Sequence, residues 1–248
     1  MWAPREQLVL TTARMLPRLV RHSVWRARDP EQGRGLAVLL VPGFGVGDWS
    51  LLPIRTWLTA RGYRPETSRT GLNLGCTTAL AGQLERRLGE IADRTGHRVV
   101  ILGQSRGGWL GRLAATRRPD LVRGLVMLAS PVLDPLGAKP ASVRAARSLT
   151  RLAALGVPGV LDDDCFDGDC YRTNRALLTE RLPAGVDGVS VYSRRDGVVP
   201  WWLCRDPWAE GIEVTSSHTA MGLDPDCYAA LEPRLAAWAK DPGGAPAR

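Results

Sequence analysis

The chain has 248 residues, of which 44% are hydrophobic and 23% are charged. This length and composition fit a globular protein of one domain or two small ones, and they exclude collagen, a coiled coil and wholesale disorder. No run of 18 apolar residues occurs, so a membrane-spanning helix is not expected.

Basic residues outnumber acidic ones by 33 to 25, which gives a formal net charge of +8. A nucleic-acid-binding protein would concentrate such charge on one face or along one helix. Here the arginines are spread along the whole chain, and no long basic run occurs. We therefore expect no nucleic-acid partner.

Residues 1–35 form a predicted N-terminal extension that lacks the uninterrupted apolar stretch of a secretory signal. The five cysteines are odd in number and scattered, which does not indicate a disulfide framework, and the expected compartment is the cytosol. An apolar stripe broken near Pro17 is expected to dock on the body of the protein, with at most transient contact to a membrane surface. The stripe consists of Leu8, Met15, Leu16, Leu19 and Val20.

From residue 36 onward, apolar runs typical of strands alternate with patterns typical of helices. Thr77 or Thr78 is expected to cap the start of the helix predicted at 77–94, and Gly96 is expected to end that helix. The alternation predicts an α/β fold, with a mostly parallel sheet and helices on both faces. In chain order, the sequence predicts a strand at 36–41, a helix at 51–60, a strand at 63–67, a helix at 77–94, a strand at 98–102, a helix at 106–118, strands at 124–129, 189–193 and 212–215, and a final helix near 226–240.

The alternation fails between residues 132 and 183, where arginine-rich helical pieces surround an acidic loop. Sheets of this kind place their chemistry in loops at the carboxyl ends of the strands, so an insertion after a strand end would cover that crevice. We predict that residues 132–183 form a small cap or lid. The predicted domain then spans residues 36–240, and residues 241–248 are expected to be a flexible tail.

The strongest motif is G-x-S-x-G, formed by Gly103, Ser105 and Gly107 between an apolar strand and a helix. Such a turn forces the serine into a strained backbone conformation, and the glycines are needed because neighbouring chains pack too closely for a Cβ. The turn lifts the hydroxyl out of the sheet, and the helix dipole behind it favours developing negative charge. The motif therefore predicts a nucleophilic serine.

A serine hydroxyl is a poor nucleophile until a base removes its proton, and the chain has three histidines. His97 precedes the strand that leads to Ser105, which places it at the opposite edge of the sheet. His22 lies before the first predicted strand. His218 follows the strand at 212–215 and falls at the carboxyl edge, so we predict His218 as the general base and acid.

The third member must be a carboxylate that orients the imidazole. Asp196 lies just past the strand at 189–193 and gives the chain order Ser, Asp, His, so it is the preferred candidate. Asp134, which follows the strand at 124–129, is an alternative. Asp224 is close to His218 in sequence, but it could instead cap the last helix.

Two backbone N–H groups are expected to form an oxyanion hole. One belongs to Arg106, the residue after the nucleophile, and the other to Phe44, in the glycine-rich loop after the first strand. The alternative is an ordinary glycine-rich loop. A phosphate cradle is not expected, because residues 41–50 lack the patterns of a P-loop and of a dinucleotide-binding loop.

Residues 41–45, 103–108, 193–199 and 217–222 together resemble α/β-hydrolases of the bacterial lipase/esterase type, in particular the branch that includes lipases of the GPI inositol-deacylase kind. The resemblance spans roughly residues 36–240, and it is least in the cap. It implies Ser105, His218 and Asp196 as a catalytic triad, with Phe44 and Arg106 as oxyanion donors. The chain departs from many members at Pro42-Gly43, where they have His-Gly, and at Gln104, where they have His; both departures bear on substrate preference.

Other signals are weaker. The acidic loop at 162–170 does not match a calcium-binding loop. Cys165 and Cys170 could form a local disulfide, and Cys204 or Cys227 could pair with one of them. No histidine lies at ligand spacing from these cysteines, so no metal site is predicted. Tryptophans could line an acyl pocket or pack in the core; the candidates are Trp109, Trp201 and Trp202.

The residues and the resemblance together favour a serine hydrolase that cleaves a small-molecule or lipid ester through an acyl-enzyme, with no cofactor. Two alternatives remain. The acyl group could pass to an acceptor other than water, which would make the protein an acyltransferase. The fold could also be a catalytically idle binding protein, although all three triad candidates are present.

Overall fold

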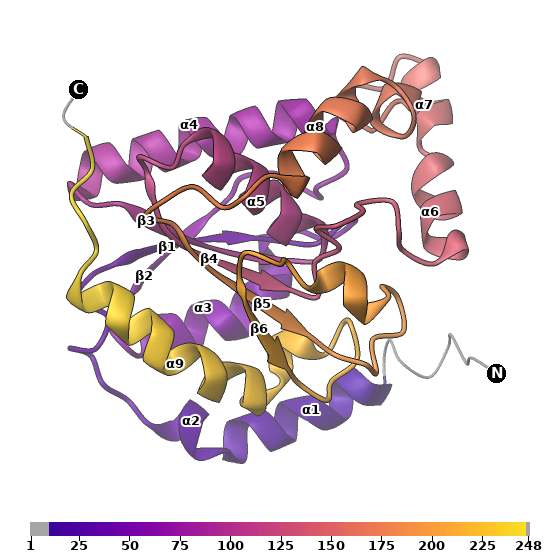
Figure 1. The fold of residues 1–248 in the computed structure, drawn as a ribbon. Helices are drawn as coiled ribbons and strands as arrows, with labels where there is room; N and C mark the ends of the chain where they lie inside the picture. Colours follow the sequence, from indigo (N-terminus) through magenta and orange to yellow (C-terminus); the bar gives the residue numbers. More distant parts are fainter. Residues whose placement is uncertain (1–9, 247–248) are drawn as a thin grey trace.

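The computed structural model describes the backbone of residues 10–246, which is built around one parallel β-sheet (Figure 1). In this part of the chain the sheet has six strands in the order β2-β1-β3-β4-β5-β6, and each neighbouring pair is parallel. All six predicted strands are present with slightly shifted ends, which confirms the predicted sheet. They are β1 (Ala37–Val41), β2 (Arg64–Thr67), β3 (Val99–Gln104), β4 (Val122–Leu128), β5 (Asp187–Tyr192) and β6 (Glu210–Glu213).

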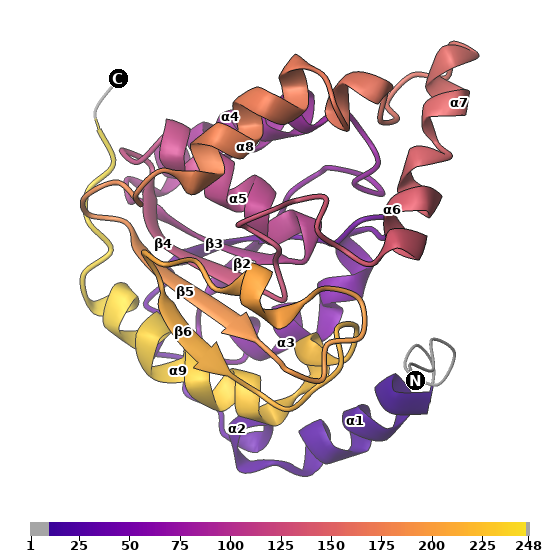
Figure 2. The ribbon, with the colours of Figure 1, turned by 45° about the vertical axis from the view of Figure 1, so that its right-hand side comes forward.

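Helices cover both faces of the sheet (Figures 1 and 2). The side chains of β1 alternate between two cores: Val38 and Leu40 belong to one, and Leu39 and Val41 to the other. Because both faces are buried, the strand is apolar at every position. The first core lies under α3 (Leu52–Thr59) and α9 (Pro225–Lys240), with α1 (Leu10–Arg21) and α2 (Ser23–Arg26) beside them; the short η1 (Asp48–Leu51) precedes α3. The second core lies under α4 (Thr77–Thr95), α5 (Arg106–Arg117) and α8 (Asp169–Thr179).

Helix α4 ends as predicted but is capped differently at its start. Gly96 follows the helix in the left-handed conformation, with φ of 72°. At the other end Cys76 occupies the N-cap position, because the helix already begins at Thr77. The prediction of Thr77 or Thr78 as the cap is therefore wrong, and no side chain makes a capping hydrogen bond there.

The N-terminal stripe packs on the body mainly through Leu19. Leu19 is fully buried in the core and Met15 is half-buried, whereas Leu16 and Val20 are exposed; Leu8 lies outside the described residues. Pro17 lies inside α1 and does not break it, contrary to prediction. Pro17 removes one backbone hydrogen bond from the helix, but burial of Leu19 in the core stabilises the turn that follows Pro17.

The predicted C-terminal tail is partly anchored. The backbone N–H of Arg98 donates to the carbonyl of Gly243, and the N–H of Ala245 donates to the carbonyl of Gly96. These bonds hold residues 243–245 against the loop that leads into β3. No helix in the described range 10–246 is both long and apolar enough to cross a membrane.

The predicted cap, residues 132–183, lies between β4 and β5 in the chain and has two unlike parts; we keep the name cap for this segment. Helix α8 packs against α4 and α5. By contrast, α6 (Pro140–Arg147) buries no residue, and α7 (Thr150–Ala154) leads into exposed apolar side chains such as Leu155. In both views α6 and α7 stand away from the sheet (Figures 1 and 2).

A buried ion pair joins α5 to the segment between β5 and β6. The Arg112 Nε donates to Asp206 Oδ2 over 2.8 Å, and both side chains are almost completely buried. The same guanidinium donates to the backbone carbonyl of Glu180, at the end of α8. The pair therefore connects three segments that pack beside one another. Removing one partner would leave a buried charge uncompensated.

We expect Asp206→Ala to lower the free energy of unfolding by about 3–5 kcal/mol, because Arg112 would stay buried without a counter-charge. The double variant Arg112→Leu/Asp206→Leu should lose less, because it buries no charge. Urea denaturation of both variants checks this. A loss for Asp206→Ala below about 1 kcal/mol, the range of exposed pairs, would contradict it.

Candidate active site

Ser105 occupies the tight turn between β3 and α5. Its φ of 51° and ψ of −120° lie outside the regions that non-glycine residues ordinarily adopt. The Ser105 N–H donates to the carbonyl of Leu128, at the end of β4, over 2.7 Å. This bond to the neighbouring strand holds the turn and places the side chain at the carboxyl edge of the sheet.

Two glycines permit the turn because backbone atoms crowd their α-carbons. A Cβ on Gly103 would collide with the backbone of Gly107, and a Cβ on Gly107 would collide with the carbonyl oxygens of Val41 and Pro42. The second contact brings the first turn of α5 against the end of β1. The spacing of the motif thus follows from close packing of backbone on backbone.

The side chains of Ser105, His218 and Asp196 form a chain of hydrogen bonds. The His218 Nε2 lies 3.0 Å from Ser105 Oγ, and its Nδ1 lies 2.7 Å from Asp196 Oδ2. With hydrogen on Nδ1, the imidazole donates to the carboxylate and accepts from the hydroxyl. The other carboxylate oxygen of Asp196 accepts the N–H groups of Val198 and Val199, each over 2.8 Å.

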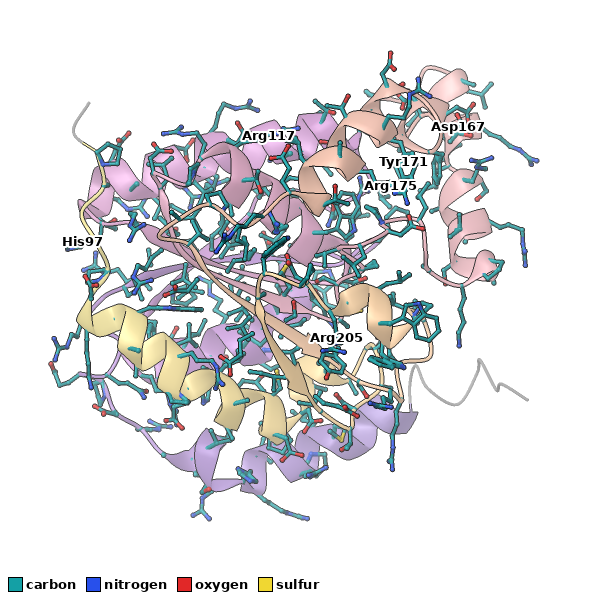
Figure 3. All side chains as sticks on the ribbon, in the orientation of Figure 1. His97, Arg117, Asp167, Tyr171, Arg175 and Arg205 are labelled. Atoms are coloured by element: carbon teal, nitrogen blue, oxygen red, sulfur yellow. The ribbon has the colours of Figure 1, made fainter. Side chains whose placement is uncertain are left out.

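The other candidates lie elsewhere. Asp134 Oδ1 accepts the hydroxyl of Tyr171, on α8 in the cap (Figure 3). Asp224 Oδ1 accepts the N–H of Asp226 and caps α9. His97 forms a bridge with Gly244 at the amino edge of the sheet, where Figure 3 shows it far from α6 and α7. Of the acids that the sequence offered, Asp196 is the one in contact with His218.

The loop after β1 packs against the serine. Strands β1 and β3 are neighbours, and a Cβ on Gly43 would lie 3.6 Å from the Cβ of Ser105. Phe44 follows directly in this loop. Arg106 is the first residue of α5, where backbone N–H groups have no partner within the helix. Both predicted oxyanion donors therefore lie on segments that adjoin Ser105.

Sequence reasoning missed Asn73, which holds this loop in place. The buried Asn73 side chain donates from Nδ2 to the carbonyl of Pro42 over 2.7 Å. The adjacent Leu72 carbonyl accepts the N–H of Gly45 over 3.0 Å. Asn73 follows β2 in a stretch without secondary structure, and no local pattern marks it, because its partner is 31 residues away.

Comparisons with solved structures agree on the fold. A lipase from Bacillus licheniformis in its mature form aligns with a TM-score of 0.62 and 14% identity, over 84% of this chain and 94% of that one. A metagenomic carboxyl esterase aligns with a TM-score of 0.63 and 18% identity, over 84% and 76%. A monoacylglycerol lipase from Paleococcus ferrophilus aligns with a TM-score of 0.55 and 16% identity, over 87% and 97%.

The chain has the α/β-hydrolase fold. The predicted fold class is confirmed. Neither a family model nor a curated protein matches the sequence. The closer likeness to the branch that includes GPI inositol-deacylase lipases stays a prediction.

One departure from many α/β-hydrolases has a structural role here. Gln104, where many members have histidine, donates from Nε2 to the backbone carbonyl of His218 over 3.2 Å. This bond links the end of β3 to the loop that carries the imidazole. The side chain thus helps to fix the position of His218 relative to Ser105.

The three tryptophans occupy different environments. Trp109 is buried in the core under α4 and α5, which favours packing over substrate contact. Trp201 stacks on Tyr192, with ring centroids 5.7 Å apart, and Trp202 is 56% exposed. A role for these residues in substrate binding stays a prediction.

Burial raises the pKa of Asp224, the N-cap of α9. Because the folded-state pKa of Asp224 exceeds its unfolded-state pKa, ionisation of the carboxyl lowers the free energy of unfolding. This loss is absent below the unfolded-state pKa, and it grows as the pH rises from there through the folded-state pKa. Asp224→Asn keeps a capping oxygen and removes the charge. We expect a higher free energy of unfolding than wild type at about pH 7 and a smaller gain near pH 4. Urea denaturation at both pH values checks this, and equal gains would contradict it.

Proposed function

We propose that the protein is a serine hydrolase that cleaves carboxylic esters, with Ser105 as nucleophile. The observation that carries this proposal is the hydrogen-bond chain from Ser105 through His218 to Asp196, on a strained turn at the carboxyl edge of an α/β-hydrolase sheet. Structural neighbours described as a lipase, a carboxyl esterase and a monoacylglycerol lipase support an ester as the substrate class.

In the proposed reaction, Ser105 Oγ attacks the ester carbonyl carbon while His218 Nε2 takes the hydroxyl proton. Asp196 holds the imidazole with hydrogen on Nδ1 and stabilises the imidazolium that forms. The N–H groups of Phe44 and Arg106 bind the oxyanion of the tetrahedral intermediate. Collapse breaks the ester C–O bond, and the alcohol leaves with the proton from His218. Water, deprotonated by His218, then attacks the acyl carbon. The bond from that carbon to Ser105 Oγ breaks, Oγ takes back the proton from His218, and the acid is released.

Asp196 suits its proposed role because its two oxygens have separate partners. The backbone N–H groups of Val198 and Val199 fix Oδ1, so Oδ2 faces the imidazole. The Asp196 side chain is only 1% exposed, and that of His218 only 10%. Charge–dipole interactions in such a dry site are stronger than in water.

A fluorophosphonate probe should label the wild-type protein, and Ser105→Ala should abolish labelling. Hydrolysis of a 4-nitrophenyl ester by this variant should fall by at least about 10⁴-fold, because the other groups cannot replace the nucleophile. The matched control is Ser130→Ala, a buried serine near the end of β4 that donates to the carbonyl of Leu128. Labelling that survives Ser105→Ala, or that is lost in Ser130→Ala alone, would refute the assignment.

Asp196→Asn should lower kcat/KM for the same ester by about 10⁴-fold without unfolding the protein. The amide oxygen can keep both backbone N–H bonds, so the NH₂ group faces His218 and imposes the wrong tautomer. Asp134→Asn is the control, because Asp134 bonds to Tyr171 and not to the imidazole. Equal losses for the two variants would show that Asp196 does not act through His218. Circular dichroism verifies folding.

A further inference from the structure

Two cysteines of the cap meet a third cysteine, from the body of the protein, that is far away in the sequence. Cys76 is the N-cap of α4, Cys165 ends η2 (Asp163–Cys165), and Cys170 lies in the first turn of α8. The Sγ atoms of Cys76 and Cys170 are 3.7 Å apart, and those of Cys165 and Cys170 are 3.5 Å apart. All three sulfurs lie within 4.8 Å of one another. The sequence offered a local pair of Cys165 and Cys170, or a pairing of one of them with Cys204 or Cys227, but not Cys76, which is 94 residues from Cys170.

These separations fit sulfur ligands around one metal ion. A tetrahedral zinc ion, bound at about 2.3 Å from each thiolate, holds two sulfurs about 3.8 Å apart. A disulfide would bring two sulfurs to about 2.05 Å and would leave the third thiol outside the bond. The observed distances place three sulfurs around a common centre instead of pairing two of them.

Polar donors surround the central sulfur. The Thr78 hydroxyl lies 3.3 Å from Cys170 Sγ, and the Asn174 Nδ2 donates to the same sulfur over 3.5 Å. The Arg117 Nη2 donates to Asn174 Oδ1 over 2.8 Å, which turns the amide nitrogen toward the Cys170 carbonyl, the Thr78 hydroxyl and the sulfur. Outer hydrogen bonds of this kind orient metal ligands and stabilise the thiolate.

A buried positive charge lies beside the same cluster. The Arg106 side chain is almost fully buried, and it donates to the carbonyls of Asn73 and Gly75 and to the hydroxyl of Thr77. These three acceptors are neutral. Among residues 15–246, whose side chains the structure describes, no carboxylate forms an ion pair with Arg106. A buried charge without a counter-charge is costly, and two of these acceptors, Gly75 and Thr77, flank Cys76 in the chain.

We propose that Cys76, Cys165 and Cys170 bind one zinc ion through their sulfurs, and that this ion fastens the cap to the body of the protein. Binding replaces three S–H bonds by three S–Zn bonds and releases three protons to solvent. One divalent ion with three thiolates carries a net charge of −1, which matches the charge of Arg106. Water completes the tetrahedral coordination. This proposal does not depend on the proposed ester hydrolysis.

The site bridges the cap and the start of α4, and Phe44 packs against the same cluster. Cys76 belongs to the body, whereas Cys165 and Cys170 belong to the cap. The apolar cluster around the sulfurs includes Phe166 and, partly buried, Phe44. The ion therefore limits movement of the cap relative to the start of α4.

Zinc titration of the fully reduced, full-length protein tests the site. We expect one zinc per chain by elemental analysis, and replacement by cobalt should give a thiolate-to-cobalt charge-transfer band. Zinc should also slow alkylation of the three thiols, whereas alkylation of the buried Cys204 and Cys227 should be the same with and without zinc. Circular dichroism verifies that the protein is folded in both conditions. Binding of no zinc by the reduced wild type, or a zinc-free protein whose intact mass lacks the hydrogens of two thiols, would overturn the proposal.

Variants distinguish ligands from packing residues. Cys76→Ser, Cys165→Ser and Cys170→Ser should each weaken zinc binding by at least about 100-fold. Asn174→Ala keeps all three ligands and should weaken it by about 10–100-fold. Cys227→Ala is the matched control, because Cys227 is a buried cysteine of α9 in the core on the other face of the sheet. Zinc binding that is unchanged in Cys170→Ser would refute the site.

Limited proteolysis with trypsin tests the fastening. Zinc should slow cleavage after the exposed arginines of α6 and α7 in the wild-type protein. It should have no such effect in Cys76→Ser, which lacks the ligand on the body side. Equal protection in both proteins would overturn the role of the ion in holding the cap.

Discussion

The contact between the first turn of α5 and the end of β1 fixes the arrangement of the loops at the carboxyl edge of the sheet. The α-carbon of Gly107 lies against the carbonyl oxygens of Val41 and Pro42, and no side chain fits between them. This packing fixes the strained turn at Ser105 and the loop that carries Phe44 relative to each other. Both depend on a parallel sheet in which β1 and β3 are neighbours. The chain order reverses at this point, because β2 lies on one side of β1 and β3 lies on the other.

Two buried arginines on helix α5 have opposite surroundings. Arg112 is paired with Asp206, and this ion pair holds α5 against the segment between β5 and β6. Arg106, about two turns earlier, donates to neutral oxygens in the described part of the chain, and its guanidinium lies 5.6 Å from the ring centroids of both Phe44 and Trp109. Burial lowers the pKa of Arg106 to about 10. In the proposed zinc site, the thiolates beside Arg106 would offset its charge at the boundary between the cap and the body of the protein.

Most of the fold and the central side chains of the candidate site could be predicted from sequence because their signals are local. The alternation of apolar runs with helical patterns predicts the strands and helices. The glycines around Ser105 predict a tight turn, because only glycine fits at those positions. His218 and Asp196 could be chosen by asking which edge of the sheet each would reach. The N-cap of α4, the continuity of α1 through Pro17 and the anchoring of residues 243–245 depended on packing and were predicted wrongly or not at all.

The sequence by itself determined the α/β pattern, the position of the tight turn at Ser105 and the edge of the sheet on which His218 and Asp196 lie, because periodicity and chain order carry that information. Only the tertiary structure decided that Asp196, and not Asp134 or Asp224, contacts His218, and that Asn73 holds the loop before Phe44. It also decided that Cys76 joins the two cysteines of the cap. These contacts join segments far apart in the chain, and the packing of helices on a shared sheet sets their distances, which no local pattern encodes.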